Sequence, residues 1–340
     1  MIIEGTVLAG AEFEPIEGRV VVEDRMIEAV EERAVPTDDI VVPAFVNAHT
    51  HIGDSIAKEA GGGLTLEELV TPPDGLKHRL LCAASYEEAV AAIERTLDFM
   101  AASGTIGFID FREGGVKGVE MLQDGADGRA ITPIILGRET TAAMELGDGF
   151  GASSVRDGEY SQERRATREA GKLFGIHAGE QDSGDINGAF DLDPDFLVHM
   201  VHPEPIHLDR LADRKTPVVV CPRSNLVTNS GVPPIASLCE RTRVALGTDN
   251  VMLNSPSMFR EMEFASKLSD VSSKTVLRMA THNGAQLAGL NCGLIEEGRD
   301  AALLVLDGDS DNLTGAQNAI RAVVRRAGYG DVKHVHYPYR

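Results

Sequence analysis

The chain has 340 residues, of which 53 are acidic and 32 are lysine or arginine, so its formal net charge is −21. This surplus of carboxylates argues against nucleic acid and anionic membrane surfaces as partners, because both attract basic patches. No apolar run approaches the roughly 18 residues that span a bilayer, and the amino terminus lacks the basic and apolar regions of a signal peptide. We therefore expect a cytoplasmic protein.

The cysteines and lysines add to this expectation. The four cysteines lie far apart with no Cys-x-x-Cys pair, which indicates neither a disulfide framework nor a zinc knuckle. Lysine supplies only 8 of the 32 basic residues. Few lysines among many carboxylates are typical of a high-salt cytoplasm, where self-repulsion is screened, and an ordinary acidic mesophilic protein is the alternative.

Short β-like segments open and close the sequence. Residues 5–8, 19–22 and 26–30 read as strands at the beginning, and residues 301–306, 319–324 and 332–336 do so at the end. Neither set carries enough apolar surface to form a core alone. We expect residues 1–42 and 291–340 to fold together as one small β-sandwich.

Between these ends, apolar strands alternate with helical patterns such as residues 86–100, which is typical of repeated βα units. Eight strand candidates end near His51, Arg112, Arg138, Val155, His177, His199, Arg223 and Asp249. Eight strands close a barrel, and about 250 residues is the usual length of one. The sequence therefore predicts an α/β protein with a TIM-like (β/α)8 barrel over residues 43–290.

Groups able to bind a metal stand at the ends of several of these strands. His49 and His51 end an apolar run at a spacing of two, so they project from one face of a strand. His177, with Glu180 three residues later, His199 and Asp249 end three further apolar runs. Imidazole and carboxylate suit Zn²⁺, Fe²⁺ or Mn²⁺, and barrel enzymes carry their catalytic groups at strand ends.

In chain order, the motifs Val-Asn-Ala-His-Thr-His, His-Ala-Gly-Glu, a strand-end His, Cys-Pro-Arg-Ser-Asn-Leu and Leu-Gly-Thr-Asp-Asn resemble the amidohydrolase superfamily. Within it the chain looks like the branch of cytosine, guanine and adenosine-type deaminases and triazine chlorohydrolases. The resemblance implies one divalent metal ion, zinc with iron or manganese as alternatives, whose ligands match His49, His51, His177 and Asp249. By the same resemblance Glu180 shuttles protons. His199 would polarise the substrate or stabilise the tetrahedral intermediate. Asp249 would also accept a proton from the attacking water, since one carboxylate oxygen can bind the ion while the other takes a hydrogen bond.

Other histidines compete with these assignments. His202 and His207 are alternatives to His199, although His202 lies past the expected strand end and His207 precedes a helix-like segment. A second His-x-His, His334 and His336, falls in the terminal β-rich part with no partner motif. We expect it to be exposed and without function.

Two departures from the family bear on the metal and the substrate. Members with two metals carry a lysine at the end of the fourth strand, where this chain has Arg156 and Asp157, and this favours one metal. A substrate-binding histidine common near that position is also absent.

Arginines end four strands instead, and they are the candidate substrate-binding residues. Arginine's planar fork suits carboxylate or phosphate, which points to an anionic or carbonyl-rich substrate. The alternative is that these arginines pair with neighbouring carboxylates such as Glu113, Glu139 and Asp157. The four are Arg112, Arg138, Arg156 and Arg223.

Together these features predict a metal-dependent hydrolase acting on a non-peptide C–N bond of a small molecule, foremost the deamination of an amino-substituted heterocycle. Hydrolysis of a cyclic amide or amidine, as in imidazolonepropionase-like relatives, is the alternative. A barrel that binds a ligand without turnover is a distant third, because a binder has no use for a proton shuttle at Glu180. A homo-oligomer remains open, since members of the superfamily often associate.

Overall fold

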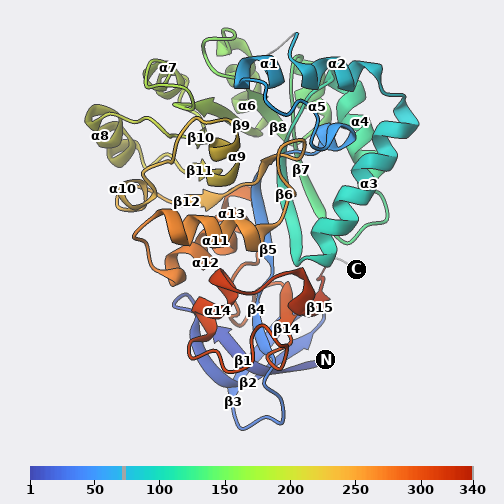
Figure 1. Cartoon of the computed structure of the whole chain (residues 1–340), viewed down its shortest axis with the longest axis vertical. Coiled ribbons are helices and arrows are strands. Elements are labelled where there is room, and N and C mark those ends of the chain that lie inside the picture. Colours follow the sequence, from blue (N-terminus) through green and yellow to red (C-terminus); the bar gives the residue numbers. More distant parts are fainter. Residues whose placement is uncertain (71–73, 339–340) are drawn as a thin grey trace.

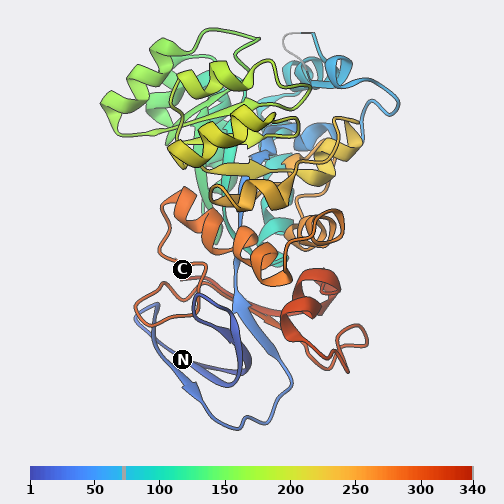
Figure 2. The same cartoon turned by 90° about the vertical axis from the view of Figure 1, so that its left-hand side faces the viewer.

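The structure is a computed structural model that describes residues 1–70 and 74–338. A barrel forms one end of the molecule, and a smaller β-rich layer lies against its base (Figure 1; Figure 2). None of the helices within the described residues is both long and apolar enough to cross a membrane.

The barrel is one parallel sheet whose strands follow the order β12-β11-β10-β9-β8-β7-β6-β5-β13. Its strands are β5 (Phe45–His51), β6 (Thr105–Arg112), β7 (Thr132–Gly137), β8 (Gly149–Ala152), β9 (Leu173–Ala178), β10 (Phe196–His199), β11 (Val218–Val220), β12 (Val244–Leu246) and β13 (Asp249–Asn250). β12 and β13 are two parts of one segment, and β13 pairs with β5 through Asp249 and Thr50, so the last segment meets the first strand. The predicted TIM-like α/β architecture is confirmed.

Close approach at this seam depends on one glycine. A Cβ atom on Gly247 would lie 2.7 Å from Cβ of His49 and 2.9 Å from its backbone nitrogen. Any larger residue would push β12 away from β5. All seven residues of β5 are buried, as expected for a parallel strand covered on both faces.

Helices surround the barrel and follow its strands. They are α1 (Leu66–Val70), α2 (Leu76–Ala83), α3 (Tyr86–Ala102), α4 (Gly115–Ala126), α5 (Thr141–Leu146), α6 (Ser161–Ala170), α7 (Ile186–Asp191), α8 (Pro205–Arg214), α9 (Pro222–Val227), α10 (Ile235–Cys239), α11 (Met258–Leu268), α12 (Ser273–Ala280) and α13 (His282–Ala288), with a 3-10 turn η1 (Ile52–Ala57) after β5.

The predicted helix at residues 86–100 corresponds to α3, and its start is encoded locally. The Ser85 side chain accepts a hydrogen bond from the backbone of Glu88, whose carboxylate accepts one from the backbone of Ser85. This capping box satisfies two backbone N–H groups that an uncapped helix leaves free. Ile93, Leu97 and Met100 then bury one face against the barrel.

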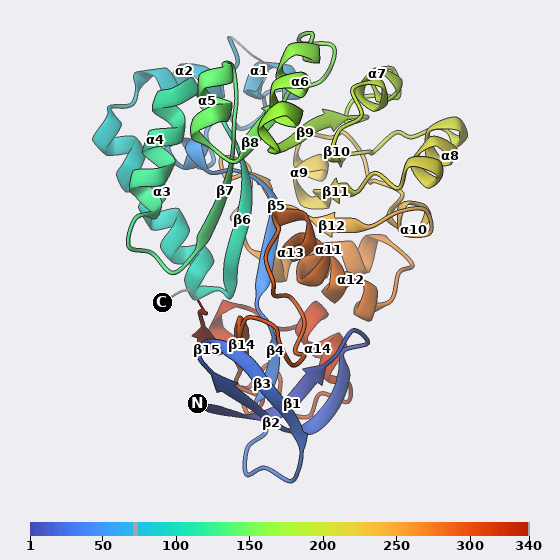
Figure 3. The ribbon, with the colours of Figure 1, turned by 180° about the vertical axis from the view of Figure 1, so that it is seen from behind.

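The smaller layer is a six-stranded mixed sheet with the order β15-β14-β4-β1-β2-β3. It combines both ends of the chain, and β4 leads directly into β5 and the barrel (Figure 3). Its strands are β1 (Ile2–Ala9), β2 (Glu14–Glu23), β3 (Met26–Glu32), β4 (Ile40–Pro43), β14 (Leu303–Leu306) and β15 (Val332–His336), the last preceded by the turn η2 (Tyr329–Asp331).

One expected strand is wrong. Residues 319–324 belong to the helix α14 (Ala319–Arg325). The Asn318 side chain accepts a hydrogen bond from the backbone of Arg321 at 2.8 Å, and Ala322, Val323 and Val324 are buried. A short apolar run does not distinguish a strand from a buried helical turn, and here the helix cap decides.

Candidate metal centre and active site

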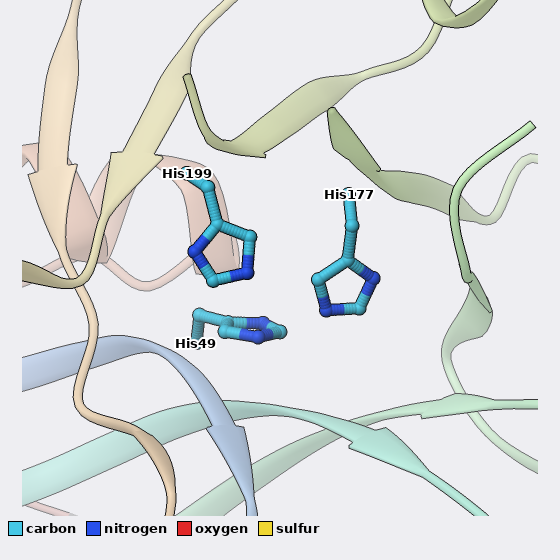
Figure 4. A group of neighbouring side chains, drawn as sticks. All are labelled: His49, His177 and His199. Atoms are coloured by element: carbon cyan, nitrogen blue, oxygen red, sulfur yellow. The ribbon is translucent and has the colours of Figure 1, made fainter. Parts of the chain in front are cut away.

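Five side chains from four barrel segments converge at the carboxyl ends of the strands. The ligand atoms of His49, His177 and His199 all lie within 4.8 Å of one another, and so do those of His49, His51 and Asp249. Figure 4 shows the first three imidazole rings converging. The structure therefore brings the four predicted ligands and His199 into one cluster, with His49 in both groups.

Neighbouring oxygen atoms orient two of the imidazoles. Nδ1 of His177 lies 2.9 Å from the carbonyl oxygen of Ala152 and donates to it. Nδ1 of His51 lies 2.8 Å from Oε1 of Glu113. A histidine whose Nδ1–H faces an oxygen presents the lone pair of Nε2 to a metal, which is the usual arrangement in metalloproteins.

The motif Cys-Pro-Arg-Ser-Asn-Leu orients two further groups from α9. Ser224 Oγ donates to Oδ2 of Asp249 at 2.6 Å, while Oδ1 lies 3.3 Å from Nε2 of His49. The amide nitrogen of Asn225 lies 3.1 Å from Nδ1 of His199. Nε2 of His199 lies 3.5 Å from Oε2 of Glu180.

The electrostatics of the cluster suit a divalent cation. Burial lowers the pKa of His49 and, together with repulsion from His49 and His199, holds the pKa of His177 well below its usual value. Burial alone would raise the pKa of Asp249, but His49 and His199 hold it well below its usual value. Neutral imidazoles and an ionised carboxylate are the forms that bind metal.

An orphaned side chain supports the same conclusion. Both ring nitrogens of His49 are buried and have no hydrogen-bond partner among the described residues, and Nδ1 of His51, although 2.8 Å from Glu113, lacks hydrogen-bond geometry. Buried polar atoms are normally satisfied, so a histidine left this way needs a ligand that the protein itself does not supply. The residues present thus fit a bound divalent metal.

Two of these side chains sit on strained backbone. His199 has φ of 77° and Asp249 has φ of 59°, in the left-handed region that residues with a side chain rarely adopt. Such conformations cost about 1–3 kcal/mol each and concentrate at functional sites. Here they turn both side chains toward the cluster at the point where their strands end.

Glu180 lies beside the cluster in a cavity of about 330 Å³, whose wall also includes His51, His177, His199 and Asp249. Burial raises the pKa of Glu180, while His199 partly opposes this shift. A carboxyl group with a raised pKa that is close to a metal-type cluster is suited to proton transfer.

Of the four candidate arginines, Arg138 and Arg156 line this cavity. Arg138 donates from Nη1 to Oε1 of Glu113 at 2.9 Å and from Nη2 to Ser153. Arg156 donates to Asp182, and its Nε lies 4.0 Å from Asp185. Both arginines therefore face the cavity while pairing with a carboxylate.

Arg112 points away from the cavity. Phe111 fills the barrel interior, with its ring centroid 4.7 Å from that of His49, so the alternation of the strand turns Arg112 outward. Its Nε donates to the carbonyl of Gly118 at 2.8 Å, and its guanidinium packs against Gly53.

Arg223 is also engaged elsewhere. β11 ends at Val220, earlier than expected, so Arg223 lies in the first turn of α9 rather than at a strand end. Its Nε lies 3.2 Å from Glu261 and its Nη2 donates to the carbonyl of Ser255. Arg112 and Arg223 are therefore not among the residues that line the cavity.

The sequence predicts Glu113 only as a possible partner of the arginines, and it does not mark Lys77 as a cavity residue. Lys77 reaches the cavity from α2 and is only 2% exposed, and Glu113 follows β6 directly. Burial alone would raise the pKa of Glu113, but Lys77, His51 and Arg138 hold it well below its usual value. The position of Glu113, one residue past the end of β6, could have indicated that it lines the cavity. No sequence pattern indicated that Lys77 would do so.

The competing histidines lie outside this cavity. The ring of His202 faces the carbonyl of Ser230, and His207 caps the start of α8 by accepting from the backbone of Glu204. On β15 of the smaller sheet, His334 is exposed, whereas His336 is half-buried, so the expectation that both are exposed is wrong for His336.

Comparison with known proteins agrees with this geometry. The amidohydrolase family model matches residues 40–181 and 161–336. An uncharacterized protein of Methanocaldococcus jannaschii is 33% identical over 367 residues, covering 98% of this chain and 96% of the relative. A 5-methylthioadenosine/S-adenosylhomocysteine deaminase of Haloarcula marismortui is 26% identical, covering 88% of this chain and 80% of the relative.

Solved structures share the fold. A zinc-bound adenosine deaminase from Xanthomonas campestris superposes with a TM-score of 0.79 at 18% identity, covering 99% of this chain and 91% of that protein. The zinc-bound atrazine chlorohydrolase of Arthrobacter aurescens also gives 0.79 at 15% identity, covering 99% and 95%. The length of the family match and the identity to the archaeal relative establish that this chain belongs to the amidohydrolase family.

Proposed function

We propose that this amidohydrolase-family hydrolase releases ammonia from a small amino-substituted heterocycle. The observation that carries the proposal is the placement of Glu180, which shares one cavity with the His/Asp cluster and faces Nε2 of His199 at 3.5 Å. A deaminase needs a proton acceptor for the attacking water and a proton donor for the departing amine. The deaminase named among the relatives supports this choice over other C–N bonds.

His49, His51, His177 and Asp249 would hold one divalent ion, for which zinc is our first candidate. When bound, such an ion lowers the pKa of a coordinated water toward neutrality. His199 is left out of this set because its Nε2 lies 3.5 Å from Glu180, where it can interact with the substrate.

The remaining residues have separable roles. Glu180 takes a proton from the attacking water and returns it to the amino group, which leaves as ammonia while the ring carbon gains an oxygen. His199 donates from Nε2 to the substrate and stabilises charge that develops on the attacked ring. Asn225 positions the His199 ring, and Ser224 fixes the Asp249 carboxylate.

The test is ammonia release by zinc-loaded protein across amino-purines, amino-pyrimidines and pterins, in low and high salt. We expect turnover that Glu180→Gln lowers by at least about 100-fold, since general acid/base catalysis contributes about 10²–10⁴. Glu159→Gln, an exposed carboxylate, is the matched control. Ring opening without ammonia would favour the cyclic amide reaction, which the same residues could perform. If fully zinc-loaded protein released no ammonia from any of these compounds, deamination of these heterocycles would be refuted.

A further inference from the structure

One wall of the cavity holds two buried cations that share a single oxygen. Lys77 Nζ lies 2.6 Å from Oε1 of Glu113, and Arg138 Nη1 lies 2.9 Å from the same atom. The side chain of Lys77 is 3% exposed, that of Arg138 is 12% exposed and that of Glu113 is 4% exposed. Two basic side chains therefore share one carboxylate oxygen in a region that excludes most water.

Within the described residues, only one other carboxylate lies within 4 Å of Lys77, and its oxygens accept hydrogen bonds from other groups. Asp54 Oδ2 is 3.9 Å from Nζ, beyond hydrogen-bond distance. Its oxygens accept from Asn250 Nδ2 at 2.9 Å and from the backbone of Met252 at 3.0 Å. An ammonium group offers three donors, and Lys77 uses one of them, toward Glu113, among the residues that the structure describes.

Arg156, on the same cavity, is engaged differently. It donates to Asp182, and no other lysine or arginine among the described residues lies within 4 Å of that carboxylate. On the wall formed by Lys77 and Arg138, by contrast, two cations share one oxygen of Glu113. Buried donors without an acceptor are costly, and an acidic oxygen group of a ligand supplies the acceptors that Lys77 lacks.

We infer that Lys77 and Arg138 bind an acidic oxygen group of the substrate, so that the enzyme acts on amino-heterocycles bearing a carboxylate or a phosphate. The inference rests on the proposed function for the identity of the ring, but not for the anion subsite itself. Lys77 is thus a specificity-determining residue that enters the cavity from α2.

The test measures binding rather than turnover, using zinc-loaded Glu180→Gln protein and titration calorimetry with two matched pairs. Pterin is compared with pterin-6-carboxylate, and adenosine with adenosine 5′-monophosphate. We expect the acidic member of at least one pair to bind about 10- to 100-fold more tightly than its neutral partner, as charge-assisted hydrogen bonds allow. The pair that shows the preference identifies the acidic group.

Adding Lys77→Met should reduce this preference at least about tenfold and change the affinity for the neutral member much less. Lys77→Arg should retain part of the preference, because it keeps the charge. Lys117→Met, on the exposed face of α4, is the matched control and should leave the preference unchanged. Zinc content is measured for each variant, and Arg138→Met replaces Lys77→Met if the latter loses zinc.

Two outcomes overturn the inference. In the first, no acidic compound binds more tightly than its neutral partner. In the second, the preference is unchanged both in the Lys77→Met variant and in the Arg138→Met variant. Failure of the proposed function looks different. A Lys77-dependent preference for acidic ligands, in a protein that releases no ammonia from them, leaves the subsite standing and rejects deamination.

Discussion

Replacing Glu113 by glutamine tests how the cavity wall supports the metal centre. The substitution keeps the shape of the side chain but removes the charge that Oε1 presents to three groups: Nδ1 of His51 at 2.8 Å, Nζ of Lys77 at 2.6 Å and Nη1 of Arg138 at 2.9 Å. Two buried cations then lack a carboxylate, and one predicted metal ligand loses the group that orients it.

Both losses have expected magnitudes. Removing one partner of a buried ion pair costs about 3–5 kcal/mol in the free energy of unfolding. Removing a carboxylate that orients a metal-binding histidine lowers metal affinity about 10- to 100-fold. We expect Glu113→Gln to show both effects, and the double variant with Lys77→Met to recover part of the stability because one uncompensated charge is gone.

Urea unfolding of the metal-free protein measures the change in the free energy of unfolding. Competition for zinc with a chelator measures the change in zinc affinity. Glu120→Gln, which changes an exposed carboxylate on α4, is the control and should alter neither. If the free energy of unfolding fell by less than about 1 kcal/mol and zinc affinity were unchanged, the contacts of Glu113 would stabilise neither the fold nor the metal site.

Three further changes test other parts of the structure. Ser224→Ala removes the 2.6 Å hydrogen bond to Asp249 and should lower zinc affinity about tenfold in chelator competition, since hydrogen bonds to charged groups contribute about 1.5–3 kcal/mol; an unchanged affinity would contradict this. Burial raises the pKa of Asp110 to about 6, so the folded state keeps this proton between about pH 4 and 6 while the unfolded state releases it. Wild-type stability should therefore fall relative to Asp110→Asn as pH rises through this window, by about 3 kcal/mol in urea unfolding, and a difference independent of pH would exclude the raised pKa. Gly53→Ala places a Cβ 1.5 Å from Nη1 of Arg112 and should cost about 1–3 kcal/mol of unfolding free energy, whereas a neutral result would mean that Arg112 moves freely.

The barrel and the cluster were predictable where a local rule fixes the geometry. The period of a strand puts His49 and His51 on one face, and a capping box marks the start of α3. α14 was missed because its apolar run is too short for periodicity to separate helix from strand. In such a run the deciding hydrogen bond, from the backbone of Arg321 to Asn318, is visible only in the fold.

The arginines and Lys77 show a second limit. A strand-end position does not fix which way a side chain points: Phe111 occupies the interior and turns Arg112 outward, while an early end of β11 places Arg223 on a helix. Lys77 lies on an eight-residue helix whose pattern gives no reason to bury a lysine. Its position depends on how α2 packs against the barrel mouth, which is a property of tertiary structure.

The seam between β13 and β5 has a consequence for synthesis of the enzyme. Asp249 faces the two histidines of β5, although about two hundred residues separate them along the chain, and Asn47 bonds Thr248 across the same seam at 2.7 Å. A nascent chain that has emerged only as far as β12 carries three of the four predicted ligands but not the fourth. The full set of four predicted ligands therefore comes together only when the last strand of the barrel pairs with the first.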